Sequence, residues 1–294
     1  MRLRRDPLMV SALLVIAMVA MALLTAGVLV WSTVLLVAVG GSVCVAGMHY
    51  LWWRGSPYLK AFDRDDWRPI YTVFVLAGFA LAAYSPIKSW LNQFGFWADP
   101  ALAALETIMF GTDPIRWLRW LAVEPLMVVY AQGWIPLMLV ALGIVARKRS
   151  HLVLTFFLIW GPASLLLQAL YQSAGPILYD PERYGPFPAL AEHYADYLIS
   201  VDRPGVGTGI SAMPSVHVMV AAWLLLVAWH GKWRWLALAF LVLIFLLSIA
   251  SGWHYALDGL IGMTIVFTLH RILGLCFAAT NGSERAQTRL MQGA

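Results

Sequence analysis

The sequence predicts an all-α, polytopic membrane protein with about eight transmembrane helices. Of its 294 residues, 61% are hydrophobic and only 12% are charged, whereas roughly a quarter of the residues in a soluble domain are charged. Several apolar runs reach the roughly 18 residues that a helix needs to cross a bilayer. Many tryptophans lie near the ends of these runs, as anchors at a membrane interface do. We therefore expect one integral membrane domain over residues 1–294.

The first half of the chain contains four of the expected spans. Residues 8–29 and 30–52 predict a helix pair within an N-terminal part, 1–53. A charged loop at 54–68 precedes the third span, which is expected at 70–84. The segment 85–120 is rich in prolines and aromatics, and it predicts short amphipathic helices in the interface at 101–110 and 115–121. The fourth span is expected at 121–146, with interruptions at Glu124–Pro125, Gln132–Gly133 and Pro136.

The second half of the chain supplies the other spans and a long polar loop. The spans are expected at 151–170, 214–229, 235–252 and 255–276. Pro214 fits the first turn of its helix, because that turn needs no backbone donor from it. The polar loop covers 171–212, and a frayed polar tail is expected at 277–294. Residues 70–275 would then contain the last six spans.

Basic residues predict the orientation of the chain. Both chain ends, the 54–68 loop, 147–149 and the 232–234 turn fall on one side of the membrane and carry most of the Lys and Arg, so that side is cytoplasmic. The acidic 171–212 loop then lies on the outer side. The net charge is +5, but no polar segment combines a row of basic residues with aromatic residues between them. Nucleic acid is therefore not expected as a partner.

Two short motifs carry the residues suited to chemistry, Ser211-Ala-Met-Pro-Ser-Val-His217 and Gly252-Trp-His-Tyr-Ala-Leu-Asp258. Residues four apart lie on one face of a helix, so we expect Asp258 to accept a hydrogen bond from His254. A carboxylate of this kind fixes the imidazole tautomer and leaves the other nitrogen as a nucleophile or base. The predicted orientation places His217, a candidate acid, at the same outer face.

The surroundings of these motifs suit an anion and offer no metal site. Ser211, Ser215 and the backbone amides at a helix start near Pro214 can bind a phosphate group, since helix N-termini present free N–H groups. The sequence has no Cys/His or carboxylate cluster with ligand spacing. Cys44 and Cys276 lie in apolar runs and fit packed or lipid-facing thiols. We expect neither a metal nor a cofactor.

Ala212-Met-Pro-Ser-Val-His217 and His254-Tyr-Ala-Leu-Asp258 resemble the second and third signature motifs of the type 2 phosphatidic acid phosphatase superfamily. The residues of the two motifs are most similar to those of the inositol phosphorylceramide synthase branch, with the sphingomyelin synthases as more distant relatives. The resemblance implies a catalytic core of six helices, here residues 70–275, and a site on the outer or luminal face. It also implies that His254 is the nucleophile, that Asp258 orients it, and that His217 protonates the leaving group.

The chain departs from the phosphatase pattern at two points. The first phosphatase motif has a lysine seven residues before Arg-Pro, but Arg203-Pro204 here follows Asp196 at that spacing. The arginine six residues before the third-motif histidine is replaced by Ser248. These departures favour the transferase-like branch and leave the phosphate-binding cations unassigned. The candidates are Arg183 and Arg203, with Lys88 behind them and Tyr179 as a pocket-lining residue; an ordinary solvated charge is the alternative for each cation.

The sequence thus predicts a membrane lipid phosphotransferase that uses a phospho-histidine intermediate, with a phospholipid donor and a lipid or alcohol acceptor. One alternative is a lipid phosphatase acting on phosphatidate or on a polyprenyl phosphate or diphosphate. A second alternative is a non-enzymatic lipid carrier with the histidines as a proton relay. The sequence specifies neither the lipids nor the oligomeric state.

Overall fold

The computed structural model describes residues 6–53, 67–148, 150–185 and 208–292, and these residues form helices joined by turns, without a strand. The long helices are α1 (Pro7–Thr25), α2 (Trp31–Trp53), α3 (Trp67–Leu91), α7 (Trp134–Arg147), α13 (Val216–Ala228), α14 (Arg234–Ala250) and α15 (Ala256–Gln292). The shorter elements are η3 (Asn92–Phe94), α4 (Asp99–Phe110), α5 (Ile115–Leu118), η4 (Arg119–Leu121), α6 (Glu124–Val128), η5 (Val129–Gly133), α8 (His151–Leu158), η6 (Ile159–Ala163), α9 (Ser164–Leu170), α10 (Pro176–Tyr179) and α11 (Pro181–Tyr184). The predicted all-α class is confirmed.

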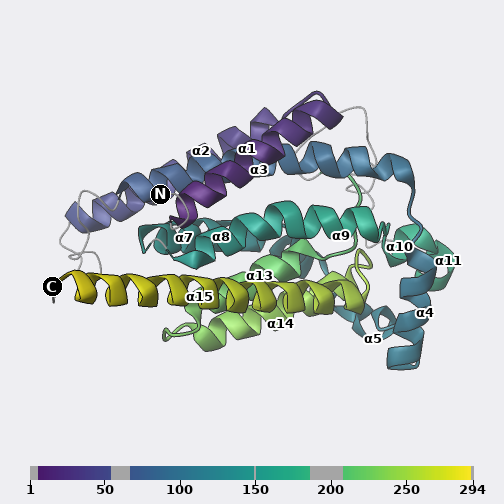
Figure 1. The fold of residues 1–294 in the computed structure, drawn as a ribbon. Helices are drawn as coiled ribbons and strands as arrows, with labels where there is room; N and C mark the ends of the chain where they lie inside the picture. Colours follow the sequence, from purple (N-terminus) through teal and green to yellow (C-terminus); the bar gives the residue numbers. More distant parts are fainter. Residues whose placement is uncertain (1–5, 54–66, 149, 186–207, 293–294) are drawn as a thin grey trace.

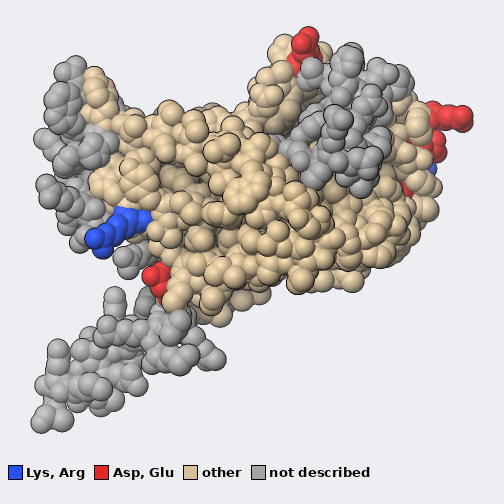
Figure 2. All heavy atoms as spheres, turned by 90° about the horizontal axis from the view of Figure 1, so that it is seen from above, with Lys and Arg blue, Asp and Glu red and all other residues tan. Residues whose placement is uncertain are grey.

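Five helical runs are long and apolar enough to cross a membrane, judged by length and composition. They are Pro7–Thr25, Trp67–Phe94, Glu124–Arg147, His151–Leu170 and Ala256–Phe277. Three shorter apolar stretches, Trp31–Gly47, Val216–Ala228 and Arg234–Ala250, lie where the remaining spans are predicted. Figure 2 shows a face of the molecule whose central part carries almost no charged side chains, as a lipid-facing belt requires.

The long helices lie in layers that run roughly side by side (Figure 1). Helices α1 and α2 pack on α3, which in turn contacts α7. Helix α13 contacts α7, α8, α14 and α15, so it occupies the centre of the bundle. The short helices α4, α5, α10 and α11 gather at one end of the bundle, and the C-terminal end of α15 lies at the opposite end (Figure 1).

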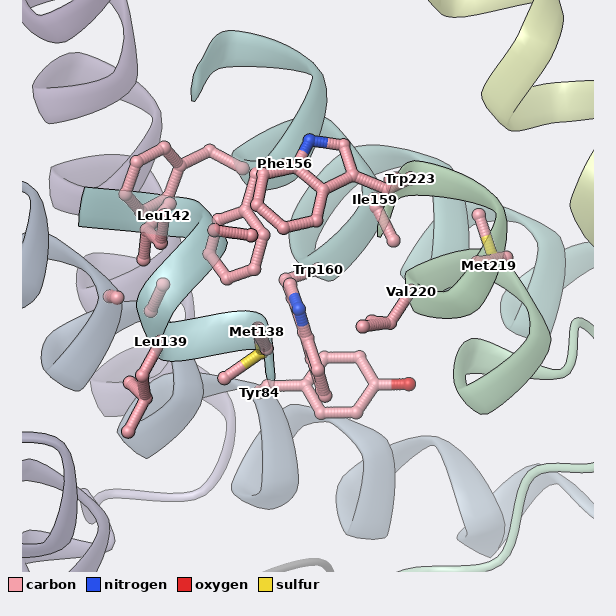
Figure 3. Close-up of a cluster of buried hydrophobic side chains, with 14 of the residues drawn as sticks. Tyr84, Met138, Leu139, Leu142, Phe156, Ile159, Trp160, Met219, Val220 and Trp223 are labelled. Atoms are coloured by element: carbon pink, nitrogen blue, oxygen red, sulfur yellow. The ribbon is translucent and has the colours of Figure 1, made fainter. Parts of the chain in front are cut away.

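The central helix is fixed by a cluster of buried aromatic side chains (Figure 3). Trp223 of α13 is fully buried, packs against Phe156 with ring centroids 5.2 Å apart, and donates its indole N–H to the carbonyl of Leu152 at 2.9 Å. Trp160 packs edge-on against Tyr84 at 5.4 Å. These contacts join α13 to α8, and η6 to α3, in the middle of the bundle.

Helix α3 continues beyond the predicted end at residue 84 and contains Pro86. A proline inside a helix normally leaves the carbonyl four residues earlier without its hydrogen bond. Here that carbonyl belongs to Ala82, and it accepts the N–H of Val30 at 3.1 Å. The neighbouring chain segment replaces the lost bond, which is how proline is tolerated inside membrane helices.

Two other predicted boundaries are wrong. Pro214 follows a cis peptide bond and precedes the sixth-span helix, which begins at Val216 with Ser215 as its N-cap. Helix α15 continues past residue 276 to Gln292. The segment 284–292 consists mostly of residues with high helix propensity, and this explains why the chain stays helical where a frayed tail is predicted.

Candidate active site

The structure brings the two histidine motifs together in the bundle. His217 lies in the first turn of α13, and His254 lies in the short link between α14 and α15. Their ring centroids are 6.5 Å apart, and the ring planes meet at 63°. The predicted meeting of the two imidazoles is therefore present in the structure.

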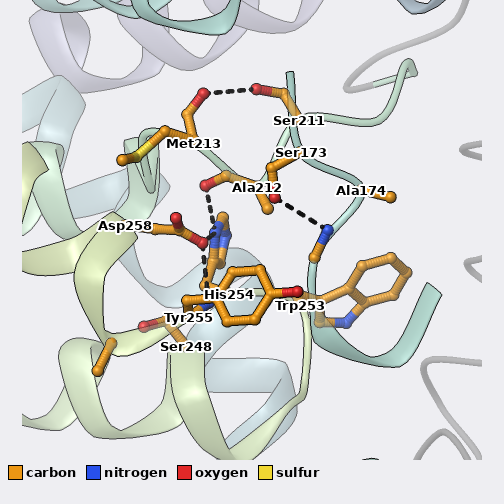
Figure 4. A network of polar contacts seen from close by, with 12 residues as sticks. Ser173, Ala174, Ser211, Ala212, Met213, Ser248, Trp253, His254, Tyr255 and Asp258 are labelled. Carbon is orange, nitrogen blue, oxygen red and sulfur yellow. Dashed lines mark hydrogen bonds and ion pairs between the residues drawn. The ribbon is translucent and has the colours of Figure 1, made fainter. Parts of the chain in front are cut away.

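The contacts of His254 determine which nitrogen is available for chemistry (Figure 4). Its Nδ1 lies 2.7 Å from the carbonyl oxygen of Ala212. A carbonyl oxygen only accepts hydrogen bonds, so Nδ1 must carry the hydrogen. In the neutral ring, Nε2 then keeps its lone pair. The second motif thus sets the tautomer of the histidine in the third motif.

Asp258 lies beside this ring, but the predicted helical geometry is wrong. Helix α15 begins at Ala256, so His254 precedes the helix on which Asp258 sits. The Oδ2 atom of Asp258 accepts the backbone N–H of Tyr255 at 2.8 Å and is 3.6 Å from Nδ1 of His254. That distance is too long for a hydrogen bond. Asp258 therefore fixes the start of α15 and places a buried carboxylate next to the imidazole.

His217 is held between aromatic rings. The ring of Tyr130 stacks on it at 4.6 Å, and Trp134 meets it edge-on at 5.4 Å. Tyr130 belongs to η5, a π-helical turn at the Gln132–Gly133 interruption predicted in the fourth span. Such turns are rare and frequently occur at functional sites. Glu124, the first residue of the same span, is exposed.

The two candidate serines lie next to the histidines but differ in their contacts. Ser211 donates its hydroxyl to the carbonyl of Met213 at 3.3 Å. Ser215 is fully buried, and its hydroxyl has no hydrogen-bond partner among the described residues. It also makes no capping bond to α13. Ser215 is consequently the serine with an unused donor beside His217.

The candidate cations are placed differently. Arg183 is bound by Asp113 at 2.6 Å and by Thr107 at 2.7 Å, and the Asp113 carboxylate raises its pKa. With Arg116 and Arg119 it lines a hollow of about 270 Å³ that does not include the histidines. Tyr179 ends α10 and is exposed. Arg203 lies outside the described residues.

The third candidate cation, Lys88, lies half-buried in the last turn of α3.

Sequence reasoning missed two buried carboxylates on α4, Asp99 and Glu106. Asp99 accepts hydrogen bonds from the loop 173–175, and Glu106 accepts the backbone N–H of Ala256 at the start of α15. Burial raises the pKa of Glu106 to about 7. The missed signal is their spacing of seven, which places both acids on one helix face.

Gly175 allows the loop after α9 to lie against the link that carries His254. Its φ is +92°, and an added Cβ would lie 2.3 Å from the carbonyl oxygen of Trp253. Gly95 has a similar backbone conformation but no atom within 4 Å of an added Cβ. We expect Gly95→Ala to cost roughly 1 to 3 kcal/mol of stability from backbone strain alone.

Gly175→Ala carries the same strain and must also displace Trp253. We expect it to lower the melting temperature in detergent more than Gly95→Ala does and to remove activity from the protein that stays folded. Equal effects of the two variants on stability and activity would contradict the close approach at Trp253.

Comparison with known proteins gives one match. A family model described as PAP2 superfamily matches residues 101–272, which is more than half of the chain. The matched segment runs from α4 into α15 and contains both histidine motifs. Searches of the curated proteins and of the solved structures found no match.

Proposed function

We propose a function for this chain on the basis of its family: the chain belongs to the PAP2 superfamily. Membership supports a function of the lipid phosphatase or lipid phosphotransferase kind. Within this range we propose a lipid phosphotransferase that resembles inositol phosphorylceramide synthase. It would move a phospho-headgroup from a donor phospholipid to an alcohol acceptor through a phospho-histidine intermediate.

In the first step, the Nε2 lone pair of His254 attacks the phosphorus of the donor phosphodiester and forms an N–P bond. The P–O bond to the lipid alcohol breaks, and the leaving oxygen takes a proton from the protonated ring of His217. The phosphorylated ring of His254 is positively charged. The carbonyl of Ala212 and the carboxylate of Asp258, 2.7 and 3.6 Å from Nδ1, stabilise that charge.

In the second step, the hydroxyl of the acceptor gives its proton to His217, which is now neutral. The acceptor oxygen attacks phosphorus, the N–P bond breaks, and His254 returns to its starting tautomer. Splitting one displacement into two is the usual advantage of covalent catalysis. With water as acceptor, the same steps describe the lipid phosphatase alternative.

The placement of the two rings is the observation that carries this proposal. An attacking atom lies roughly 3 to 3.5 Å from the atom it attacks, and a catalytic acid lies roughly 2.6 to 3.2 Å from the oxygen it protonates. Ring centroids 6.5 Å apart allow both contacts to one phosphoryl group. The hydroxyl of Ser215, which has no hydrogen-bond partner among the described residues, is available for a phosphoryl oxygen.

Two features favour the transferase over the phosphatase. The residues of the two motifs resemble those of the inositol phosphorylceramide synthase branch. In addition, Ser248 occupies the position at which the phosphatases have an arginine. The Ser248 hydroxyl donates to the carbonyl of Phe245 at 2.7 Å, so the residue is part of the packing of α14. We also propose that the site faces the outer leaflet and that both chain ends are cytoplasmic, since most basic segments fall on the side of the chain ends.

The test uses purified protein in vesicles with phospholipid that is labelled in its headgroup and confined to one leaflet, with a lipid alcohol as acceptor. We expect a new labelled lipid when the donor lies in the leaflet next to the site. Free labelled phosphate or phospho-headgroup without a new lipid would support the phosphatase alternative. Movement of uncleaved donor between leaflets, without any product, would overturn both enzymatic functions and support a lipid carrier.

A further inference from the structure

Helix α4 has an inverted distribution of polar and apolar side chains. Its two carboxylates face the protein, where Glu106 is only 2% exposed and Asp99 is fully buried. Leu102 and Ala103 are buried beside them, but the larger apolar side chains of Leu105, Ile108 and Met109 face outward, and Ile108 is 78% exposed. The sequence predicts an amphipathic helix in the membrane interface at this place, and the outward apolar face fits that position. Burial of two carboxylates is unfavourable unless each is well hydrogen-bonded.

Glu106 receives its hydrogen bond from the first residue of α15. Its Oε1 accepts the backbone N–H of Ala256, which lies two residues after His254. The first N–H groups of a helix have no partner inside the helix, and a negative charge at a helix N-terminus is stabilising. Glu106 therefore ties α4 to the segment that follows the catalytic histidine.

Asp99 binds a different segment, the loop 173–175. It accepts the hydroxyl of Ser173 at 2.7 Å and the N–H groups of Ala174 and Gly175 at 2.8 and 3.1 Å. The carbonyl of Ser173 accepts the N–H of Ala212 at 2.9 Å. Asp99 is thus connected to Ala212, the residue whose carbonyl holds the imidazole.

One connection ends on His254, and the other ends two residues after it, on Ala256. The chain of contacts from Asp99 reaches Nδ1 of His254 through Ser173 and Ala212, as Figure 4 shows for its last members. The contact from Glu106 reaches the backbone N–H of Ala256, the first residue of α15.

We propose that Asp99 and Glu106 are positioning residues that hold His254 in its reactive orientation, so that α4 sets the direction of Nε2. This inference rests on the proposed function. It requires that the hydrogen bond accepted by the side-chain oxygen of residue 106 holds His254 in place, and that the burial of α4 is not sufficient by itself.

The charges around Glu106 explain why glutamine is the informative substitution. Asp258 of α15 and Asp113 before α5 add negative charge to the effect of burial, and Arg183 of α11 opposes it. With a pKa of about 7, the carboxyl is partly protonated at neutral pH. Glu106→Gln keeps an acceptor oxygen for Ala256 without the charge, whereas Glu106→Leu removes the acceptor.

The test measures lipid turnover by Glu106→Gln, Glu106→Leu and Glu106→Asp, with Glu182→Leu as a control at an exposed carboxylate. We expect Glu106→Leu to lower kcat on the order of 10- to 100-fold with KM unchanged, since a misplacement of about 1 Å has that effect. Glu106→Gln should retain most of the activity. Glu106→Asp keeps the charge but not the reach, so it should resemble Glu106→Leu.

A second readout does not depend on activity. Amide hydrogen exchange of peptides covering 252–258 and 211–217 should be faster in Glu106→Leu than in Glu106→Gln or Glu182→Leu, while the melting temperatures of the folded variants stay close. Unchanged exchange and unchanged kcat in Glu106→Leu would overturn the inference. If the wild type turns over no lipid but the exchange pattern is as expected, the proposed function fails and the positioning contacts stand.

Discussion

His254→Asn is expected to abolish lipid turnover, with a loss of kcat on the order of 10⁴-fold or more, because it removes the proposed nucleophile. Asparagine is the sharpest replacement because its side-chain N–H₂ can still donate to the carbonyl of Ala212. The hydrogen bond that holds the second and third motifs together is then preserved while Nε2 is lost. The measurement is the rate of product formation in vesicles, normalised to folded protein by melting temperature.

His230→Asn is the matched control, because His230 lies exposed in the turn between α13 and α14. We expect that variant to turn over lipid at the rate of the wild type. Near-normal activity of folded His254→Asn would remove the nucleophile from the proposed mechanism.

His217→Asn is expected to lower kcat by roughly 10² to 10⁴, the usual contribution of a general acid. The loss should depend on the leaving group, since a good leaving group needs little protonation. With a nitrophenyl phosphodiester in place of the donor lipid, the variant should regain most of the wild-type rate. The same substrate should not rescue His254→Asn, because that variant cannot form the N–P bond.

The comparison of the two variants separates the roles of the rings. Loss that is independent of the leaving group in His217→Asn would show that this ring positions the site rather than supplies a proton. The aromatic contacts of His217 with Tyr130 and Trp134 make a loss of packing possible, so melting temperatures must accompany the rates.

Much of the fold could be predicted because the bilayer imposes a length on each apolar run. The expected spans correspond to the observed helices, and deviations occur where local bonding depends on distant residues. Helix α3 passes through Pro86 only because Val30 supplies a hydrogen bond to Ala82. The residues around Pro86 do not indicate that a donor from a distant part of the chain will be present.

The pairing of the histidines could be predicted from the order of the spans. His217 begins one span and His254 lies between the next two, so both are expected at the same face of the membrane. Their detailed contacts could not be predicted. The spacing of His254 and Asp258 suggests a shared helix, but α15 begins at Ala256, and the nearest acceptor for Nδ1 is a backbone carbonyl. Every residue type has a backbone carbonyl, so the sequence cannot indicate which carbonyl accepts the hydrogen bond. That Ala212 accepts it from Nδ1 of His254 is known only from the structure.

The carboxylates of α4 show a different limit. An acidic residue on a short amphipathic helix is normally assigned to its solvated face. Asp99 and Glu106 are buried because unpaired N–H groups of the 173–175 loop and of the α15 start lie opposite them. These donors come from distant segments, and only their meeting in the fold makes burial of the acids favourable.

The most direct test of the mechanism is to locate the covalent intermediate. Wild-type protein is mixed with donor lipid labelled in its phosphate, without acceptor, quenched in alkali to preserve phospho-histidine, and digested for mass spectrometry. The account predicts a labelled adduct on His254, in the peptide that contains residues 252–258. Cleavage of the donor with no adduct, or an adduct on another residue such as Ser215, would contradict it.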